Sequence, residues 1–143
     1  MAKITLKDLS HSYLEKQNSN ADWALREVNI DWKDGGAYAL LGPSGCGKTT
    51  LLNIVSGLLK PTKGNVLFDD KDITAFSPVE RDIAQIFQFP VIYDTMTVYD
   101  NLAFPLKNRG LSETDIASKV KEIAEMLELT STLNNRASGL TAD

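Results

Sequence analysis

A glycine-rich segment at residues 42–50 constrains this chain more than any other feature. It fits the pattern G-x-x-x-x-G-K-[ST] of a phosphate-binding loop, or P-loop. Glycines let backbone N–H groups converge on phosphate oxygens, because no side chain stands between them. In such a loop Lys48 supplies positive charge to the β- and γ-phosphates, and the Thr49 hydroxyl is a ligand of Mg²⁺. The predicted nucleotide contacts here are Gly42, Pro43, Ser44, Gly45, Cys46, Gly47, Lys48, Thr49 and Thr50.

The residues on either side of the loop support this interpretation. Residues 37–41 form a short apolar run, which predicts a buried strand leading into the loop. Apolar residues at helical spacing in 50–59 predict a helix that leaves the loop. The N-terminus of such a helix adds its positive dipole to a phosphate site. Strand, loop and helix together therefore favour triphosphate binding over a glycine-rich turn of purely structural importance.

Length and composition exclude several classes of protein. The 143 residues amount to one domain, and 15 basic against 19 acidic residues give a formal net charge of −4. This balance gives no support to a nucleic-acid-binding surface. No run approaches the ~20 apolar residues that span a bilayer, so we expect any membrane role to be peripheral. The single cysteine, Cys46, excludes an intrachain disulfide and fits a reducing compartment.

Periodicity and turn residues predict the other elements. Alternating apolar residues predict strands at 4–6 and 28–32, with a polar loop at 15–22 between them. Further strands are expected at 65–68 and 83–88, and the acidic turn 69–72 follows the first of these. From about residue 97 the pattern is helical, with one helix over 98–108 that Pro105 is expected to kink or shorten. A capping box at 112–115 predicts the start of a second helix. His11 is the single histidine and has no companion that could bind a metal with it, so it is taken to be incidental.

The order of these motifs resembles that of the ATP-binding subunit of an ABC transporter. Tyr13 stands where that family places an aromatic residue against adenine, and Ile86-Phe87-Gln88 resembles its Q-loop. The run TMTVYDNL at 95–102 is similar to importers of sugars, polyols and glycerol phosphate. The resemblance implies an α/β fold in truncated form. Residues 1–96 would be a P-loop NTPase core with an N-terminal antiparallel β portion, and residues 97–143 the start of an α-helical subdomain.

The resemblance also assigns roles to single residues. Gln88 would bind Mg²⁺ or the attacking water, which makes Lys48 and Gln88 the expected catalytic residues and Thr49 and Gln88 the expected metal ligands. Tyr13 would lie against adenine, and residues 89–92 would line a groove for a helix of the membrane subunit. The plainer alternatives are an ordinary glutamine at a strand end and an aromatic residue used only for packing.

The last residues depart from the family's pattern. Its signature L-S-G-G-Q corresponds here to Leu140-Thr141-Ala142-Asp143, so that Ala142 and Asp143 replace two glycines that let a backbone approach a phosphate. No apolar strand ending in Asp-Glu follows, and neither does the family's switch histidine. We therefore expect an N-terminal piece of a longer subunit, with a degenerate signature, that binds nucleotide weakly if at all and hydrolyses it poorly.

The implied function is uptake of a solute, energised by ATP and Mg²⁺, at the cytoplasmic face of the inner membrane. The expected partners are transmembrane permease subunits, a second ATP-binding subunit and, indirectly, a solute-binding protein, with no nucleic acid. Two other functions stay open: a nucleotide-sensing module without turnover, and a small P-loop metabolite kinase, for which the arginines are too scattered to form a lid. Unpaired sheet edges and an uncovered apolar face in such a piece also predict self-association.

Overall fold

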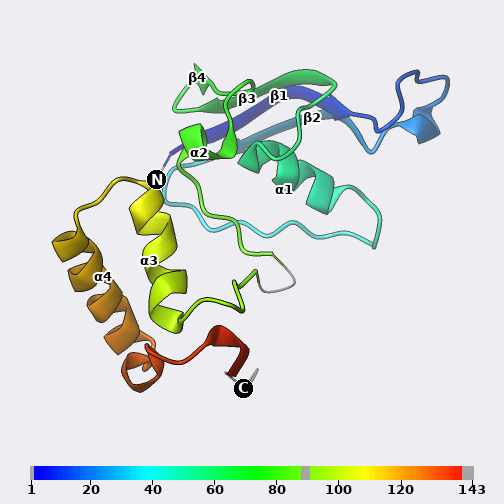
Figure 1. Cartoon of the computed structure of the whole chain (residues 1–143). Coiled ribbons are helices and arrows are strands. Elements are labelled where there is room, and N and C mark those ends of the chain that lie inside the picture. Colours follow the sequence, from blue (N-terminus) through cyan, green and yellow to red (C-terminus); the bar gives the residue numbers. More distant parts are fainter. Residues whose placement is uncertain (1, 88–90, 140–143) are drawn as a thin grey trace. The chain divides into compact units, whose positions relative to one another are not determined.

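The computed structural model describes residues 2–87 and 91–139. The chain divides into two compact units, Met1–Gln85 and Ile86–Asp143. The first unit contains a β-sheet and the helix that follows the P-loop, and the second contains two longer helices (Figure 1). Within the described residues, no helix is both long and apolar enough to cross a bilayer.

Four strands form an antiparallel sheet in the first unit. Strand β1 spans Ile4–His11, β2 Leu25–Trp32, β3 Lys63–Phe68 and β4 Lys71–Asp72, in the spatial order β2-β1-β3-β4 (Figure 1). The strands predicted at 4–6, 28–32 and 65–68 are confirmed, and each is longer than expected. The predicted loop at 15–22 holds only a 3-10 turn, η1, at Asn20–Asp22. These strands build the platform on which the P-loop helix packs.

A β-bulge decides which side chains of β1 enter the core. Strict alternation would place Leu6 and Leu9 on opposite faces, yet both are buried in one cluster. The register of β1 against β2 shifts between these two leucines, where Asp8 has a left-handed φ of 48°. Asn29 fixes the bulge from β2: its Oδ1 accepts a hydrogen bond from the Asp8 N–H at 2.9 Å, and its Nδ2 donates to Asp8 Oδ1 at 3.0 Å. The extra residue turns Leu9 to the side of Leu6.

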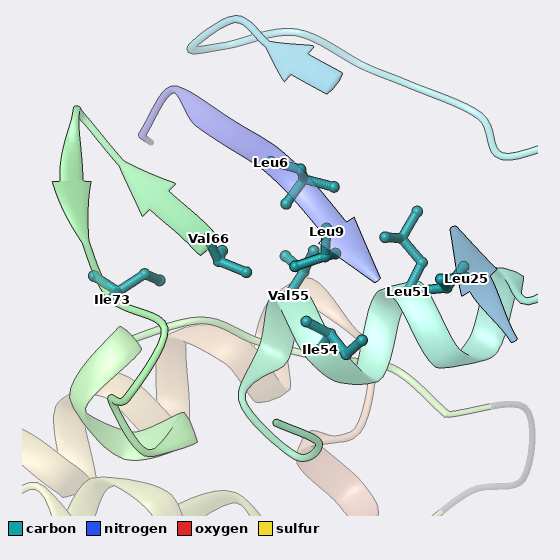
Figure 2. Packing of buried hydrophobic residues seen from close by; sticks show 8 residues of the cluster. All are labelled: Leu6, Leu9, Leu25, Leu51, Ile54, Val55, Val66 and Ile73. Atoms are coloured by element: carbon teal, nitrogen blue, oxygen red, sulfur yellow. The ribbon is translucent and has the colours of Figure 1, made fainter. Parts of the chain in front are cut away.

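The core of the first unit lies between the sheet and helix α1, which spans Lys48–Ser56 (Figure 2). The buried residues of this core are Leu6, Leu9, Leu25, Leu51, Ile54, Val55, Val66 and Ile73, of which all but Ile73 lie in the helix or the strands. The helix was predicted to continue to residue 59 and ends three residues earlier. Gly57 terminates it in a left-handed conformation with φ of 83°, which glycine adopts without steric cost.

Two predicted strands are not formed. Residues 37–41 run without a strand partner, and Leu41 is 91% exposed instead of buried. Residues 83–87 are likewise not part of a strand, with Ile86 98% exposed, and Gln88 lies outside the described residues. A buried strand of a parallel sheet needs neighbouring strands to satisfy its backbone and cover its side chains. Nothing in residues 2–87 and 91–139 pairs with these segments as a strand.

A single helical turn, α2 at Pro78–Arg81, follows the sheet. The Ser77 N–H donates to the carboxylate of Glu80 at 2.8 Å, and the Ser77 hydroxyl accepts from the Glu80 N–H at 3.4 Å. This reciprocal arrangement is a capping box, and proline suits the first helical position because its ring presets φ. The turn ends by placing the side chain of Arg81 in the interior of the unit.

Helices dominate the second unit. α3 spans Val98–Asn108 and α4 spans Glu113–Met126, which confirms both predicted helices, and Pro105 lies inside α3 without ending it. The Thr97 hydroxyl begins α3 by accepting from the Asp100 N–H at 3.0 Å, and the Ser112 hydroxyl begins α4 in the same way. The helices pack through Ala103, Ile116 and Val120. Two short 3-10 turns follow, η2 at Thr130–Thr132 and η3 at Ala137–Gly139.

Candidate functional site

The P-loop begins α1 at a position where only glycine fits. Gly47 precedes the first helical residue with a left-handed φ of 92°. A Cβ built on it would lie 2.6 Å from the Ala24 carbonyl oxygen and 2.8 Å from Cδ2 of Leu25. The absence of a side chain therefore lets the start of α1 approach the start of β2. The amide groups of the first helical turn have no acceptor within the helix and remain available for an anion.

Lys48 folds back over the loop. Its Nζ donates to the carbonyl oxygens of Gly42 at 2.8 Å and Pro43 at 2.7 Å, and it lies 3.5 Å from the Sγ of Cys46. The two carbonyl oxygens are neutral acceptors, and a negatively charged phosphate is a stronger acceptor for an ammonium group. Lysine charge and helix dipole are thus both placed to attract an anion to the loop.

The structure brings Tyr13 to the same place, although 29 positions separate it from Gly42. Its hydroxyl lies 3.1 Å from Oγ1 of Thr50. A cavity of about 350 Å³, called here the P-loop hollow, is lined by Tyr13, Ala24, Ser44, Gly45, Gly47, Lys48, Thr49 and Thr50. The hollow therefore combines an aromatic ring with the glycine-rich loop and its lysine, which are groups that can contact the base and the phosphates of a nucleotide.

His11 has a structural task that the sequence did not reveal. The side chain was taken to be incidental, yet it is buried, and its ring meets that of Tyr13 edge-on with the centroids 4.7 Å apart. Its Nδ1 lies 3.5 Å from the hydroxyl of Thr62. His11 therefore supports the aromatic ring at the P-loop hollow. No periodicity signal distinguishes this role, because it depends on how β1 continues into residue 13.

A larger cavity in the first unit does not suit a triphosphate. The apolar hollow, of about 720 Å³, is lined mainly by side chains without charge, among them Ile4, Trp32, Tyr38, Leu40, Leu52 and Phe68. An apolar wall gives no compensation for the lost hydration of a phosphate. The smaller P-loop hollow is therefore the better candidate for a nucleotide site.

The oxygen donors beside the P-loop fit a Mg²⁺ ion that binds together with a nucleotide. Thr49 lines the P-loop hollow and is exposed. Among the described residues, no group of three or more His, Cys, Asp or Glu side chains is arranged to hold a metal ion. Mg²⁺ commonly keeps several waters and is bound through one or two protein ligands together with substrate phosphates. A single hydroxyl beside the loop is consistent with that mode.

Several predicted residues cannot be placed. Gln88, Phe89, Pro90 and the signature positions 140–143 lie outside the described residues. Val91 and Ile92, predicted to line a groove, are exposed in the second unit. The structure therefore brings Tyr13 and the P-loop together. It does not test the predictions for the Q-loop and the signature.

Comparison with known proteins extends the similarity to most of the chain. The sequence model of the ABC transporter family matches residues 25–142. The trehalose/maltose import ATP-binding protein MalK of Thermococcus litoralis is 45% identical over 119 residues, which are 79% of this chain and 32% of that protein. The sn-glycerol-3-phosphate import ATP-binding protein UgpC of Psychromonas ingrahamii is 38% identical over 141 residues, 99% of this chain and 36% of that protein. The chain thus spans about a third of the length of these relatives.

Solved structures agree with this result. The ATP-binding cassette MJ1267 of an ABC transporter superposes with a TM-score of 0.81 at 30% identity, over 99% of this chain and 60% of that one. The ATP-binding cassette MJ0796, in a dimeric post-hydrolysis state bound to ADP and Pi, gives 0.79 at 28% identity, over 96% and 63%. These likenesses confirm the predicted α/β P-loop fold class. The chain, P-loop and helices included, therefore belongs to the ABC transporter family.

Proposed function

We propose that this chain forms the ATP-binding part of an ATPase that energises uptake of a solute, in the class of sugars, polyols and glycerol phosphate. The observation that supports ATP binding best is the P-loop hollow, where Lys48, Thr49 and the N-terminus of α1 face the same space as Tyr13. The substrate class is supported by relatives named for import of trehalose, maltose and sn-glycerol 3-phosphate.

In this proposal the protein binds ATP by positioning its phosphates and by neutralising their negative charge. Lys48 would exchange the carbonyls of Gly42 and Pro43, which now hold its Nζ at 2.8 and 2.7 Å, for phosphate oxygens. The amide groups and dipole of α1 would hold the same negative charge. Thr49 would hold Mg²⁺, which supplies further charge compensation when bound. Tyr13 would lie against the adenine ring.

The whole subunit is proposed to hydrolyse ATP with the help of Gln88, which would orient water or Mg²⁺. It would pair with a second ATP-binding subunit and act on transmembrane permease subunits at the cytoplasmic face of the membrane, with a solute-binding protein as an indirect partner. The dimeric state described for MJ0796 supports the pairing, and the names of the import proteins support the permease partner. We retain residues 1–96 and 97–143 as proposed functional parts. The comparisons favour neither the sensing module nor the metabolite kinase.

Binding of Mg-ATP to the 143-residue chain tests the proposal, with titration calorimetry as the measurement. We expect saturable binding that Lys48→Ala weakens by about tenfold or more, because a charge-assisted hydrogen bond is lost. Lys60→Ala is the matched control: it removes the same charge from an exposed position outside the P-loop hollow and should leave the affinity unchanged. Binding that does not depend on Lys48, or no binding, would contradict the proposal.

A further inference from the structure

Arg81 is a buried cation to which the proposed function gives no task. The side chain is 6% exposed and donates to four backbone carbonyls. Nη1 donates to the oxygens of Ile54 and Val55, both at 2.8 Å. Nε donates to Phe76 at 3.1 Å, and Nη2 to Thr74 at 3.0 Å. Burying a guanidinium is costly unless its N–H groups are paired, so this arrangement needs each of these acceptors.

Two of the four acceptors are the carbonyls at the end of the P-loop helix. Ile54 and Val55 belong to the last turn of α1, whose carbonyls form the negative end of the helix dipole. The Ile54 oxygen also accepts from the N–H of Gly57 at 3.1 Å. Gly57 leaves the space that the guanidinium fills, since a Cβ on it would lie 2.7 Å from Nε of Arg81. Burial lowers the pKa of Arg81, and the nearby carboxylate of Asp72 partly offsets this effect. The group stays charged at any ordinary pH.

The other two acceptors connect the guanidinium to the sheet. Thr74 and Phe76 follow β4, and the Thr74 hydroxyl accepts from the N–H of Val66 in β3 at 2.8 Å. The apolar contacts of α1 with the sheet are non-directional and allow small shifts along the helix axis. A planar guanidinium with fixed donor directions does not allow them. Arg81 therefore adds a directional restraint to the apolar contacts of the core.

We propose that Arg81 is a positioning residue for the P-loop, which fixes where α1 lies along its own axis relative to the sheet. Through the helix it would set the position of Lys48, Thr49 and the amides of the loop at the other end. The helix has 9 residues and is roughly 13 Å long, so Arg81 acts without touching the nucleotide. This inference rests on the proposed ATP site.

Two substitutions test it in the 143-residue chain by Mg-ATP affinity. Arg81→Lys keeps the charge but replaces the planar fork by an ammonium with three donors. We expect about a tenfold loss of affinity in Arg81→Lys and a larger loss in Arg81→Ala, since one or more charged hydrogen bonds to α1 disappear. Arg26→Ala removes the same charge from an exposed position and should bind as the unsubstituted chain does. All affinities are measured well below the unfolding temperature of each variant.

A rescue experiment separates positioning from general loss of structure. Guanidinium ion at a concentration too low to denature the protein should restore part of the ATP affinity of Arg81→Ala, because the ion can occupy the vacated site between the carbonyls. Sodium chloride at equal ionic strength should not restore it. Lys48→Ala should not respond to guanidinium, because its defect lies in the loop itself.

If Arg81→Ala does not fold, amide hydrogen exchange of Arg81→Lys tests whether Arg81 positions α1. In Arg81→Lys the amides of α1 should exchange faster while those of β1 keep their protection. Unchanged ATP affinity in a folded Arg81 variant would overturn the positioning role and leave the proposed function intact. Equally faster exchange in α1 and β1, or lost affinity that guanidinium does not restore, would also overturn it. Absence of Lys48-dependent binding in the unsubstituted chain would instead overturn the proposed function.

Discussion

At the scale of single residues, the P-loop places a thiol beside the ammonium group that is proposed to bind phosphate. Cys46 is exposed, and its Sγ lies 3.5 Å from Nζ of Lys48. The same sulfur occupies the space opposite Gly42, since a Cβ on that glycine would lie 2.6 Å from it. A group added to this thiol would lie beside Lys48, in the part of the loop that is proposed to receive the phosphates.

Alkylation of Cys46 is therefore expected to abolish measurable Mg-ATP binding, and ATP added beforehand is expected to slow the alkylation. The reason is steric, because the added group competes for the space enclosed by the loop. Mass spectrometry gives the extent of modification and calorimetry gives the affinity. Cys46→Ser, treated in the same way, serves as the control and should keep its affinity. Full affinity after complete alkylation would contradict this prediction.

Residues differ in how far the sequence reveals their roles. Gly47 and Lys48 are recognisable because the loop needs fixed residue types at fixed spacing. Arg81 has no such signal: its acceptors are backbone carbonyls of Ile54, Val55, Thr74 and Phe76, which any residue can supply. The role of such a residue becomes visible only when the chain has folded around it.

At the scale of elements, the turn after β4 depends on an ionised carboxylate. Asp72 Oδ1 accepts from the hydroxyl of Thr74 at 2.6 Å and from its N–H at 2.9 Å, and Oδ2 accepts from Asn65 at 2.7 Å. The bonds from Thr74 are the main reason that the pKa of Asp72 lies below its ordinary value of 3.8. The carboxylate thereby connects the turn after β4 to Asn65 in β3.

Acid should weaken the contribution that the ionised Asp72 carboxylate makes to the stability of the fold. Because the folded-state pKa is lower than the ordinary value, the contribution is complete above about pH 3.8 and is lost as the pH falls through the folded-state pKa. Asp72→Asn is therefore expected to lower the unfolding temperature at pH 6, with the difference from the unsubstituted chain shrinking toward pH 2. Thermal melts followed by circular dichroism measure both. A difference that does not change with pH would show that ionisation of Asp72 is unimportant.

Helices were predicted better than strands, for a local reason. The starts of α3 and α4 depend on Thr97 and Ser112, whose hydroxyls accept N–H groups three residues ahead. The strands expected at 37–41 and 83–88 depend on hydrogen bonds from other segments, so their apolar sequences were insufficient to form them. The bulge in β1 also depends on a neighbouring segment, because it arises where β1 pairs with β2.

At the scale of the whole molecule, apolar surface remains uncovered in the first unit. The apolar hollow of about 720 Å³ has Leu52 in its lining, and Leu52 is 46% exposed. The neighbouring residues 37–41 are not part of a strand. Apolar surface of this kind commonly mediates association, and an unpaired extended segment can add a strand to another chain.

We expect the chain to self-associate in a concentration-dependent manner, as measured by analytical ultracentrifugation. Leu52→Lys should shift the equilibrium toward monomer, because a charge in the apolar hollow opposes its burial. Leu58→Lys is the matched control, since Leu58 is similarly exposed at 52% and does not line that hollow. A monomer at every concentration, or equal effects of the two substitutions, would contradict the assignment of the association surface.

The sequence by itself determined the P-loop motif, the strands β1 to β3, both long helices and membership of a family. These features depend on residue types at short, fixed separations, for which local geometry and hydrophobic periodicity are sufficient. Only the tertiary structure decided that Leu9 joins Leu6 in the core, that His11 supports Tyr13, and that Arg81 holds the end of α1. It also decided that residues 37–41 remain unpaired. Each of these outcomes depends on contacts between segments far apart in the chain, and a buried or hydrogen-bonded position exists only after those segments have met.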